Sequence, residues 1–230
     1  MIYIFDVDGT LTPSSKPIEK DFQNFFIEWA SNKKFVLVSG SPYKKIERQL
    51  GKTIISMAQS VFPCSGLEQW QNFKPIWHYN YTFPADLYIL LENHLEKSSY
   101  PYKTGNHIDD RGSLINFSVV GRGSDKYRKD YFLWDLQNSE RKRIVKDIES
   151  KFDVSVSIGG EISIDIVPPG WGKHKILAHL SGDDEYTFFG DRIEVDENDH
   201  SIYQELINRN PNRVYKTIGW DNTIELLNRI

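Results

Sequence analysis

Short apolar runs that stop abruptly at polar residues and glycine recur along this chain, a pattern typical of buried β-strands that end in loops. The first run, Ile2–Phe5, leads directly into Asp6-Val7-Asp8-Gly9-Thr10-Leu11-Thr12, and a second, Phe35–Val38, leads into Ser39-Gly40-Ser41-Pro42. Because strands and amphipathic helices alternate, the first sixty residues predict a parallel sheet with right-handed crossovers. The expected elements are strands at 2–5, 35–38 and ending at 61–62, with helices at 18–31 and 43–50, the latter closed by Gly51.

The pattern changes in the middle of the chain, where residues 70–83 are rich in aromatic side chains and show no clear period. Strand then follows strand, and Gly159-Gly160 between two alternating runs predicts a β-hairpin. We therefore predict an antiparallel α+β unit at residues 77–167, inserted into the parallel one. Its expected elements are helices at 84–97 and 138–152, strands at 108, 113–121, 154–157 and 162–166, and a turn at 109–112.

The last third returns to the alternation of the first, and completes an α/β core made of residues 1–76 and 168–230. Pro168-Pro169-Gly170-Trp171-Gly172-Lys173 leads into a helix to Leu180, and an apolar strand at 186–189 ends in Gly190-Asp191. A helix at 202–208, a strand at 213–217 and a helix from 221 are expected to follow.

The composition is that of a globular protein without a general affinity for polyanions. With 39% hydrophobic and 26% charged residues, the 230-residue chain has an ordinary globular balance. A formal net charge of −4 gives no general attraction to nucleic acid or to an anionic membrane. Cys64 is the one cysteine, and no stretch approaches 18 consecutive apolar residues. We expect a cytoplasmic protein without nucleic-acid or membrane partners.

The loop after the first strand carries the most distinctive chemistry. Asp6 and Asp8 are two positions apart, so their side chains can converge where the extended chain turns. Two carboxylates this close repel each other unless a cation or a shared proton relieves them, and Mg²⁺ prefers such oxygen ligands. The alternative interpretation is an N-capping cluster at the start of the next helix.

Parallel strands bring their carboxyl ends to one edge of the sheet, where ligands bind in open α/β folds. We expect Asp191 to complete a Mg²⁺ site with Asp6 and the backbone carbonyl of Asp8. Asp6 is the candidate nucleophile toward phosphorus and Asp8 the general acid and base. Ser39 and Lys173 would neutralise the transferring oxygens. Taken singly, Lys173 fits a solvated helix-start lysine and Asp191 a turn residue.

The string Asp6–Thr12 resembles the nucleophile motif of the haloacid-dehalogenase (HAD) superfamily. Over nearly its whole length the chain resembles the eukaryotic-type phosphomannomutases of that superfamily. This resemblance implies a HAD-like Rossmannoid core with an inserted α+β cap of the C2 type. The segments that carry it, besides residues 6–12, are 114–122, 157–165, 170–173, 188–191 and 198–200.

By this resemblance, cap arginines hold the phosphate that is not reacting, while hairpin residues meet that phosphate and the sugar hydroxyls. An ordinary salt-bridged surface is the alternative interpretation of these arginines. The chain departs from the family in the loop 13–16, where Lys16 substitutes for an arginine, and at Cys64-Ser65-Gly66 and Asp196-Glu197. The candidate substrate-binding residues are Lys16, Arg111, Arg122, Arg128, Ser163 and Asp165.

Our leading hypothesis is a Mg²⁺-dependent enzyme that interconverts mannose 6-phosphate and mannose 1-phosphate through an aspartyl-phosphate. A hexose 1,6-bisphosphate would be its intermediate and activator, and the resemblance implies a homodimer formed through the cap. One alternative is a HAD phosphatase that uses the same residues to hydrolyse a sugar phosphate. A second alternative is a non-catalytic protein that binds a sugar phosphate.

Overall fold

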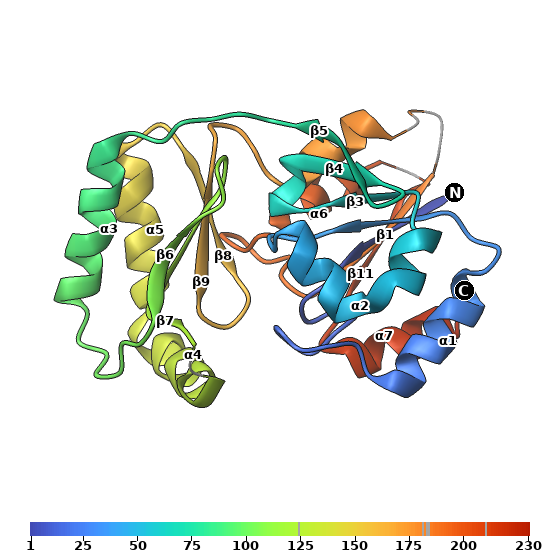
Figure 1. The fold of residues 1–230 in the computed structure, drawn as a ribbon, viewed down its shortest axis with the longest axis horizontal. Coiled ribbons are helices and arrows are strands. Elements are labelled where there is room, and N and C mark those ends of the chain that lie inside the picture. Colours follow the sequence, from blue (N-terminus) through green and yellow to red (C-terminus); the bar gives the residue numbers. More distant parts are fainter. Residues whose placement is uncertain (124, 181, 183–184, 210) are drawn as a thin grey trace. The chain divides into compact units, whose positions relative to one another are not determined.

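The computed structural model describes residues 1–123, 125–180, 182, 185–209 and 211–230, and it divides into two compact units. We call Met1–Tyr79 together with Gly172–Ile230 the core unit, and Asn80–Trp171 the inserted unit. Figure 1 shows the elements of both. The sequence pattern predicts the insertion at 77–167, and the structure divides the chain after Tyr79 and after Trp171. Among the described residues, none of the helices has the length and apolar composition that a membrane crossing requires.

The core unit is built on a sheet that has seven strands among the described residues, in the order β11-β10-β1-β2-β3-β4-β5. The first five are parallel, as predicted, and β4 and β5 add an antiparallel hairpin at one edge. This hairpin was not predicted, because β5 is largely exposed and contains Pro75, which edge strands tolerate. The bounds are β1 Ile2–Asp6, β2 Phe35–Val38, β3 Ser60–Phe62, β4 Glu68–Gln71, β5 Lys74–His78, β10 Tyr186–Gly190 and β11 Arg213–Lys216.

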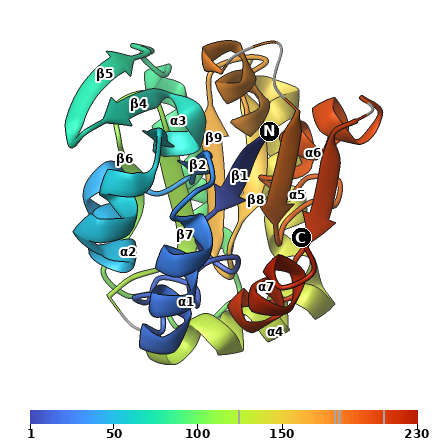
Figure 2. The same cartoon turned by 90° about the vertical axis from the view of Figure 1, so that its right-hand side faces the viewer.

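Helices cover both faces of this sheet, so its central strands are buried on each side. One face packs against α1 (Lys20–Ala30), α2 (Tyr43–Met57) and α7 (Trp220–Leu227), which lie near one another in Figure 2. The other packs against the 3₁₀ helix η3 (Lys173–His179) and α6 (His200–Ile207). The predicted helix 43–50 does end at Gly51, whose φ of 80° and ψ of 160° are not helical. A second helical segment, which was not predicted, then continues α2 to Met57 and buries Ile54 and Ile55 in the core.

The inserted unit contains an antiparallel sheet of four described strands in the order β6-β7-β9-β8. One face packs against α3 (Ala85–Lys97) and α5 (Glu140–Lys151), which Figure 1 shows side by side. A further helix, α4 (Arg128–Asn138), was not predicted, because its apolar residues Leu133 and Leu136 are exposed and form no buried stripe. The strands are β6 Asn106–Asp110, β7 Ile115–Arg122, β8 Ser155–Gly159 and β9 Ser163–Val167.

Candidate active site

Asp6 is the last residue of β1, and its side chain is buried at the carboxyl edge of the core sheet. The apolar residues before it hold it there, since Ile4 and Phe5 are fully buried on opposite faces. Asp6 pairs in register with Val38, the last residue of β2, so Ser39, which follows Val38, lies near Asp6 at the end of the strands. On the other side, Phe5 pairs with Phe189 of β10, and Asp191 is the first residue after this strand. The register therefore brings Asp6, Ser39 and Asp191 to one edge, as the sequence predicts.

Lys173 begins η3 and is fully buried. Its ammonium donates to Asp6 Oδ1 at 2.5 Å and to Asp199 Oδ1 at 2.6 Å. A buried ammonium requires such partners, and the two carboxylates raise the pKa of Lys173 by more than burial lowers it. Lys173 is therefore a permanent cation beside the candidate nucleophile.

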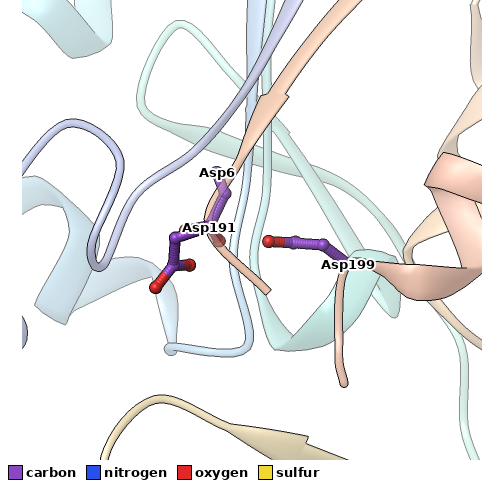
Figure 3. A group of neighbouring side chains, drawn as sticks. All are labelled: Asp6, Asp191 and Asp199. Atoms are coloured by element: carbon purple, nitrogen blue, oxygen red, sulfur yellow. The ribbon is translucent and has the colours of Figure 1, made fainter. Parts of the chain in front are cut away.

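Three carboxylates converge here, because Asp6, Asp191 and Asp199 each place an oxygen within 4.8 Å of the others. Figure 3 shows Asp199 extending its carboxylate toward Asp6 and Asp191. The backbone of the first loop passes very near. A Cβ on Gly9, whose φ is +89°, would lie 2.4 Å from Asp191 Oδ2, so glycine is required at this position.

This group fits a hard divalent cation. Burial raises the pKa of Asp6 well above its ordinary value, and repulsion from Asp199 and Asp191 adds to the effect against the opposing charge of Lys173. Burial and the neighbouring Asp199 likewise raise the pKa of Asp191 to about 7. Carboxylates that resist ionisation because they are buried together are relieved by a divalent ion with oxygen preference, such as Mg²⁺. The donor set therefore supports a metal centre at these residues.

We expect Mg²⁺ to bind more tightly and to stabilise the protein more at about pH 8 than at about pH 6, because bound protons must leave the cluster first. The Asp191 carboxyl has a pKa of 3.8 in the unfolded chain and of about 7 in the metal-free folded protein. Its contribution to the stability of the metal-free fold is therefore fully present below pH 3.8 and is lost as the pH rises through about 7. Thermal unfolding with EDTA and with saturating Mg²⁺ at both pH values measures this. Equal stabilisation by Mg²⁺ at the two pH values would show that the carboxylates are already ionised without it.

Asp8 lies outside the three-carboxylate group. Its carboxylate accepts hydrogen bonds from the backbone N–H of Ser15 at 2.6 Å, Gln49 Nε2 at 2.9 Å and Ser41 Oγ at 3.1 Å. Lys45 Nζ lies 3.1 Å away. Burial raises the pKa of Asp8, but Lys45 and these hydrogen bonds outweigh it, so the pKa falls below its ordinary value. These contacts favour the ionised carboxylate of Asp8, and its roles as a base and, through its backbone carbonyl, as a metal ligand stay predictions.

The other two core candidates, Ser39 and Lys16, each bond to a residue that contacts Asp8. Ser39 is buried, and its Oγ accepts a hydrogen bond from the backbone N–H of Ser41 at 3.1 Å. Lys16 is exposed in the loop after the first motif, where its backbone carbonyl accepts from Gln49 Nε2 at 3.2 Å. Gln49 thus ties this loop to α2.

The structure also brings together the candidates of the inserted unit. Burial lowers the pKa of the Arg122 guanidinium to about 10, and Arg111 and Arg128 lower it further while Asp109 and Asp165 oppose them. These five side chains are therefore near neighbours, and Arg122 still remains a cation at neutral pH. Arg128 Nε donates to Glu161 at 3.2 Å, and Ser163 lies two residues from Asp165 on β9. The three arginines lie among the carboxylates of Asp109, Asp165 and Glu161, and we call Arg111, Arg122 and Arg128 the arginine group.

Sequence reasoning missed two residues of the core site, Asp199 and Lys45. Asp199 is fully buried and is held by a reciprocal pair of hydrogen bonds with Arg192, whose backbone N–H donates to Asp199 Oδ2 and whose carbonyl accepts from Asp199 N–H. The signal for Asp199 was its place in the conspicuous string Asn198-Asp199-His200. Lys45 sits on an amphipathic helix, where a lysine gives no signal of a site.

A family model described as eukaryotic phosphomannomutase matches residues 22–225. The phosphomannomutase of Drosophila melanogaster is 30% identical over 221 residues, covering 89% of this chain and 87% of that protein. The phosphomannomutase of Dendrobium officinale is 33% identical over 214 residues, covering 89% and 85%.

A similar solved structure is a haloacid dehalogenase-like hydrolase from Bacteroides thetaiotaomicron. It has a TM-score of 0.59 and 17% sequence identity, with 99% of this chain and 98% of that chain covered. At this identity the likeness shows the fold alone. The predicted fold class, a HAD-like α/β core with an inserted α+β unit, is confirmed.

Proposed function

This chain belongs to the eukaryotic phosphomannomutase family, and we propose that it interconverts mannose 6-phosphate and mannose 1-phosphate. The observation that supports this chemistry most directly is the buried carboxylate of Asp6. It contacts a permanent cation, Lys173, and lies among carboxylates that suit a divalent metal. This combination provides a nucleophile whose charge is screened from an incoming phosphate. The inserted unit is then the cap, and its arginine group the distal phosphate site.

In the first half-reaction, Asp6 carries the phosphoryl group as an aspartyl-phosphate. Asp8 removes the proton from a hydroxyl of the bound sugar phosphate, and the resulting oxygen attacks phosphorus. The bond between phosphorus and Asp6 breaks, Asp6 leaves as a carboxylate, and a hexose 1,6-bisphosphate forms. The base form of Asp8, which its contacts with Lys45 and Gln49 favour, suits this step.

In the second half-reaction the bisphosphate has turned end for end. Asp6 attacks the other phosphorus, the phosphorus–sugar bond breaks, and the sugar oxygen takes the proton from Asp8. Lys173 and Ser39 neutralise and position the transferring oxygens. Mg²⁺, held by Asp6 and Asp191 with Asp199 or the Asp8 carbonyl, would supply further charge at this point. A bisphosphate from solution would restore the aspartyl-phosphate whenever water removes it.

The cap has to hold the second phosphate of the same substrate. Arg111, Arg122 and Arg128 are suited to this, because a planar guanidinium contacts a phosphate in two places and keeps its charge. The proposal includes a homodimer through the cap, where the exposed Leu133 and Leu136 of α4 are available for a contact. It also includes a cytoplasmic setting, which a single cysteine fits.

An NMR time course on mannose 1-phosphate, with Mg²⁺ and a trace of hexose 1,6-bisphosphate, tests the proposal. We expect mannose 6-phosphate to appear with little inorganic phosphate, because the cap keeps water from the aspartyl-phosphate. Release of phosphate without the isomer would identify a phosphatase instead. Binding without any turnover would identify a sugar-phosphate binding protein.

A further inference from the structure

A row of polar residues crosses the sheet of the inserted unit. Asp109 on β6 is the cross-strand partner of Asn116 on β7, which in turn is the partner of Asp165 on β9. Directly paired residues point to the same face of a sheet. The alternate residues, among them Ile115 and Ile164, lie in the apolar core on the other face. Asp109 therefore belongs to the polar face, two residues from Arg111 on the same chain.

Asp109 interacts with two of the three candidate arginines. Its Oδ2 accepts hydrogen bonds from Arg111 Nε at 2.8 Å and Arg111 Nη2 at 2.7 Å. Arg122 Nε lies 3.7 Å from the same atom, and Arg122 Nη2 donates to the Asn116 carbonyl at 2.7 Å. One carboxylate thus lies between two guanidinium groups that would otherwise repel each other: it accepts two hydrogen bonds from Arg111, and its charge attracts Arg122, which the Asn116 carbonyl also holds.

We propose that Asp109 is a positioning residue for the distal phosphate site: it holds the Arg111 and Arg122 guanidinium groups in the orientation in which they receive a sugar phosphate. This inference rests on the proposed function, which assigns the distal phosphate to these arginines. An arginine held in place loses less rotamer freedom when it binds, so a preorganised pair binds an anion more tightly. Asp109 acts through the arginines and does not itself touch the substrate.

Two substitutions of Asp109 separate orientation from charge. Asp109→Ala removes the acceptor, so we expect KM for mannose 1-phosphate to rise about tenfold. KM is obtained from the total turnover rate at a series of mannose 1-phosphate concentrations with Mg²⁺. Asp109→Asn keeps an acceptor oxygen in the same place, and KM should stay within about threefold of wild type. If Asp109 instead competed with phosphate for the arginines, both substitutions would lower KM, which would overturn the proposal.

Two controls distinguish positioning from a merely structural role. Asp110→Asn removes the same charge from the next residue, whose exposed carboxylate accepts from Tyr88 Oη at 2.6 Å and from Gly112 N–H, and KM should not change. Hydrolysis of acetyl phosphate, which has no second phosphate, should be as fast in Asp109→Ala as in wild type. Equal losses on acetyl phosphate and on mannose 1-phosphate would contradict a positioning role.

Arg111→Ala distinguishes an error in the proposed function from an error in the role of Asp109. If it leaves KM for mannose 1-phosphate unchanged, the assignment of the distal phosphate to the arginines is wrong, and the proposed function must be revised. If Arg111→Ala raises KM while Asp109→Ala does not, the function stands and the role of Asp109 is refuted.

Discussion

Replacing Asp6 by Asn is expected to lower kcat for both isomerisation and phosphate release by about 10⁴-fold or more. An amide nitrogen or oxygen cannot form the aspartyl-phosphate. The substitution preserves shape and an acceptor for Lys173, so the affinity for sugar phosphate should change little. Measurements of kcat with Mg²⁺, together with trapping of the phospho-enzyme from radiolabelled bisphosphate, check both parts.

Asp21→Asn is a matched control, because it makes the same chemical change at an exposed position in the first turn of α1. It should behave as wild type. Turnover of the Asp6→Asn variant within tenfold of wild type, or a phospho-enzyme that still forms, would show that another residue is the nucleophile.

Replacing Lys173 by Met is expected to give the largest loss of stability, about 3–5 kcal/mol in the free energy of unfolding. The ammonium is fully buried and bonds to Asp6 and Asp199, so its loss leaves two buried carboxylates without their cation beside Asp191. Because the pKa of Lys173 is raised, its contribution is fully present at neutral pH and would be lost only at strongly alkaline pH. Urea unfolding in EDTA measures the loss.

Mg²⁺ should restore part of the stability of Lys173→Met, since a divalent ion replaces the missing charge. Lowering the pH should also narrow the difference from wild type, because protonation neutralises the unpaired carboxylates. Lys175→Met, two residues further along η3 and exposed, is the control for the loss of a lysine. A Lys173→Met variant as stable as wild type in EDTA would show that the carboxylates of the cluster are protonated in the metal-free protein.

Local patterns were sufficient for most of the core. The run Ile2–Phe5 has apolar side chains on both faces, which only a strand covered on both sides can bury. The alternation around Gly159-Gly160 likewise specified a hairpin, although Gly159 itself belongs to β8 and the turn begins at Gly160. Where burial and periodicity coincide, the sequence alone is informative.

Predictions failed where the packing partner, rather than the local pattern, decides the structure. Only Tyr131 and Asp135 of α4 are buried, so the helix has no apolar stripe to detect. Asp135 instead joins Arg141 of α5 in a buried ion pair at 2.7 Å. The helical segment beyond Gly51 was likewise not predicted, because its place in the fold depends on the burial of Ile54 and Ile55 in the core.

The sequence by itself determined that Asp6 ends a buried strand at the carboxyl edge of a parallel sheet, and that Asp191 follows another strand of the same sheet. These follow from hydrophobic runs and their terminating residues, which are local properties. Only the tertiary structure decided which side chains meet. Asp199 completes the carboxylate group, while Asp8 is held by Lys45 and Gln49, 37 and 41 positions away. Contacts between residues so distant depend on how the helices pack, and no local pattern encodes that.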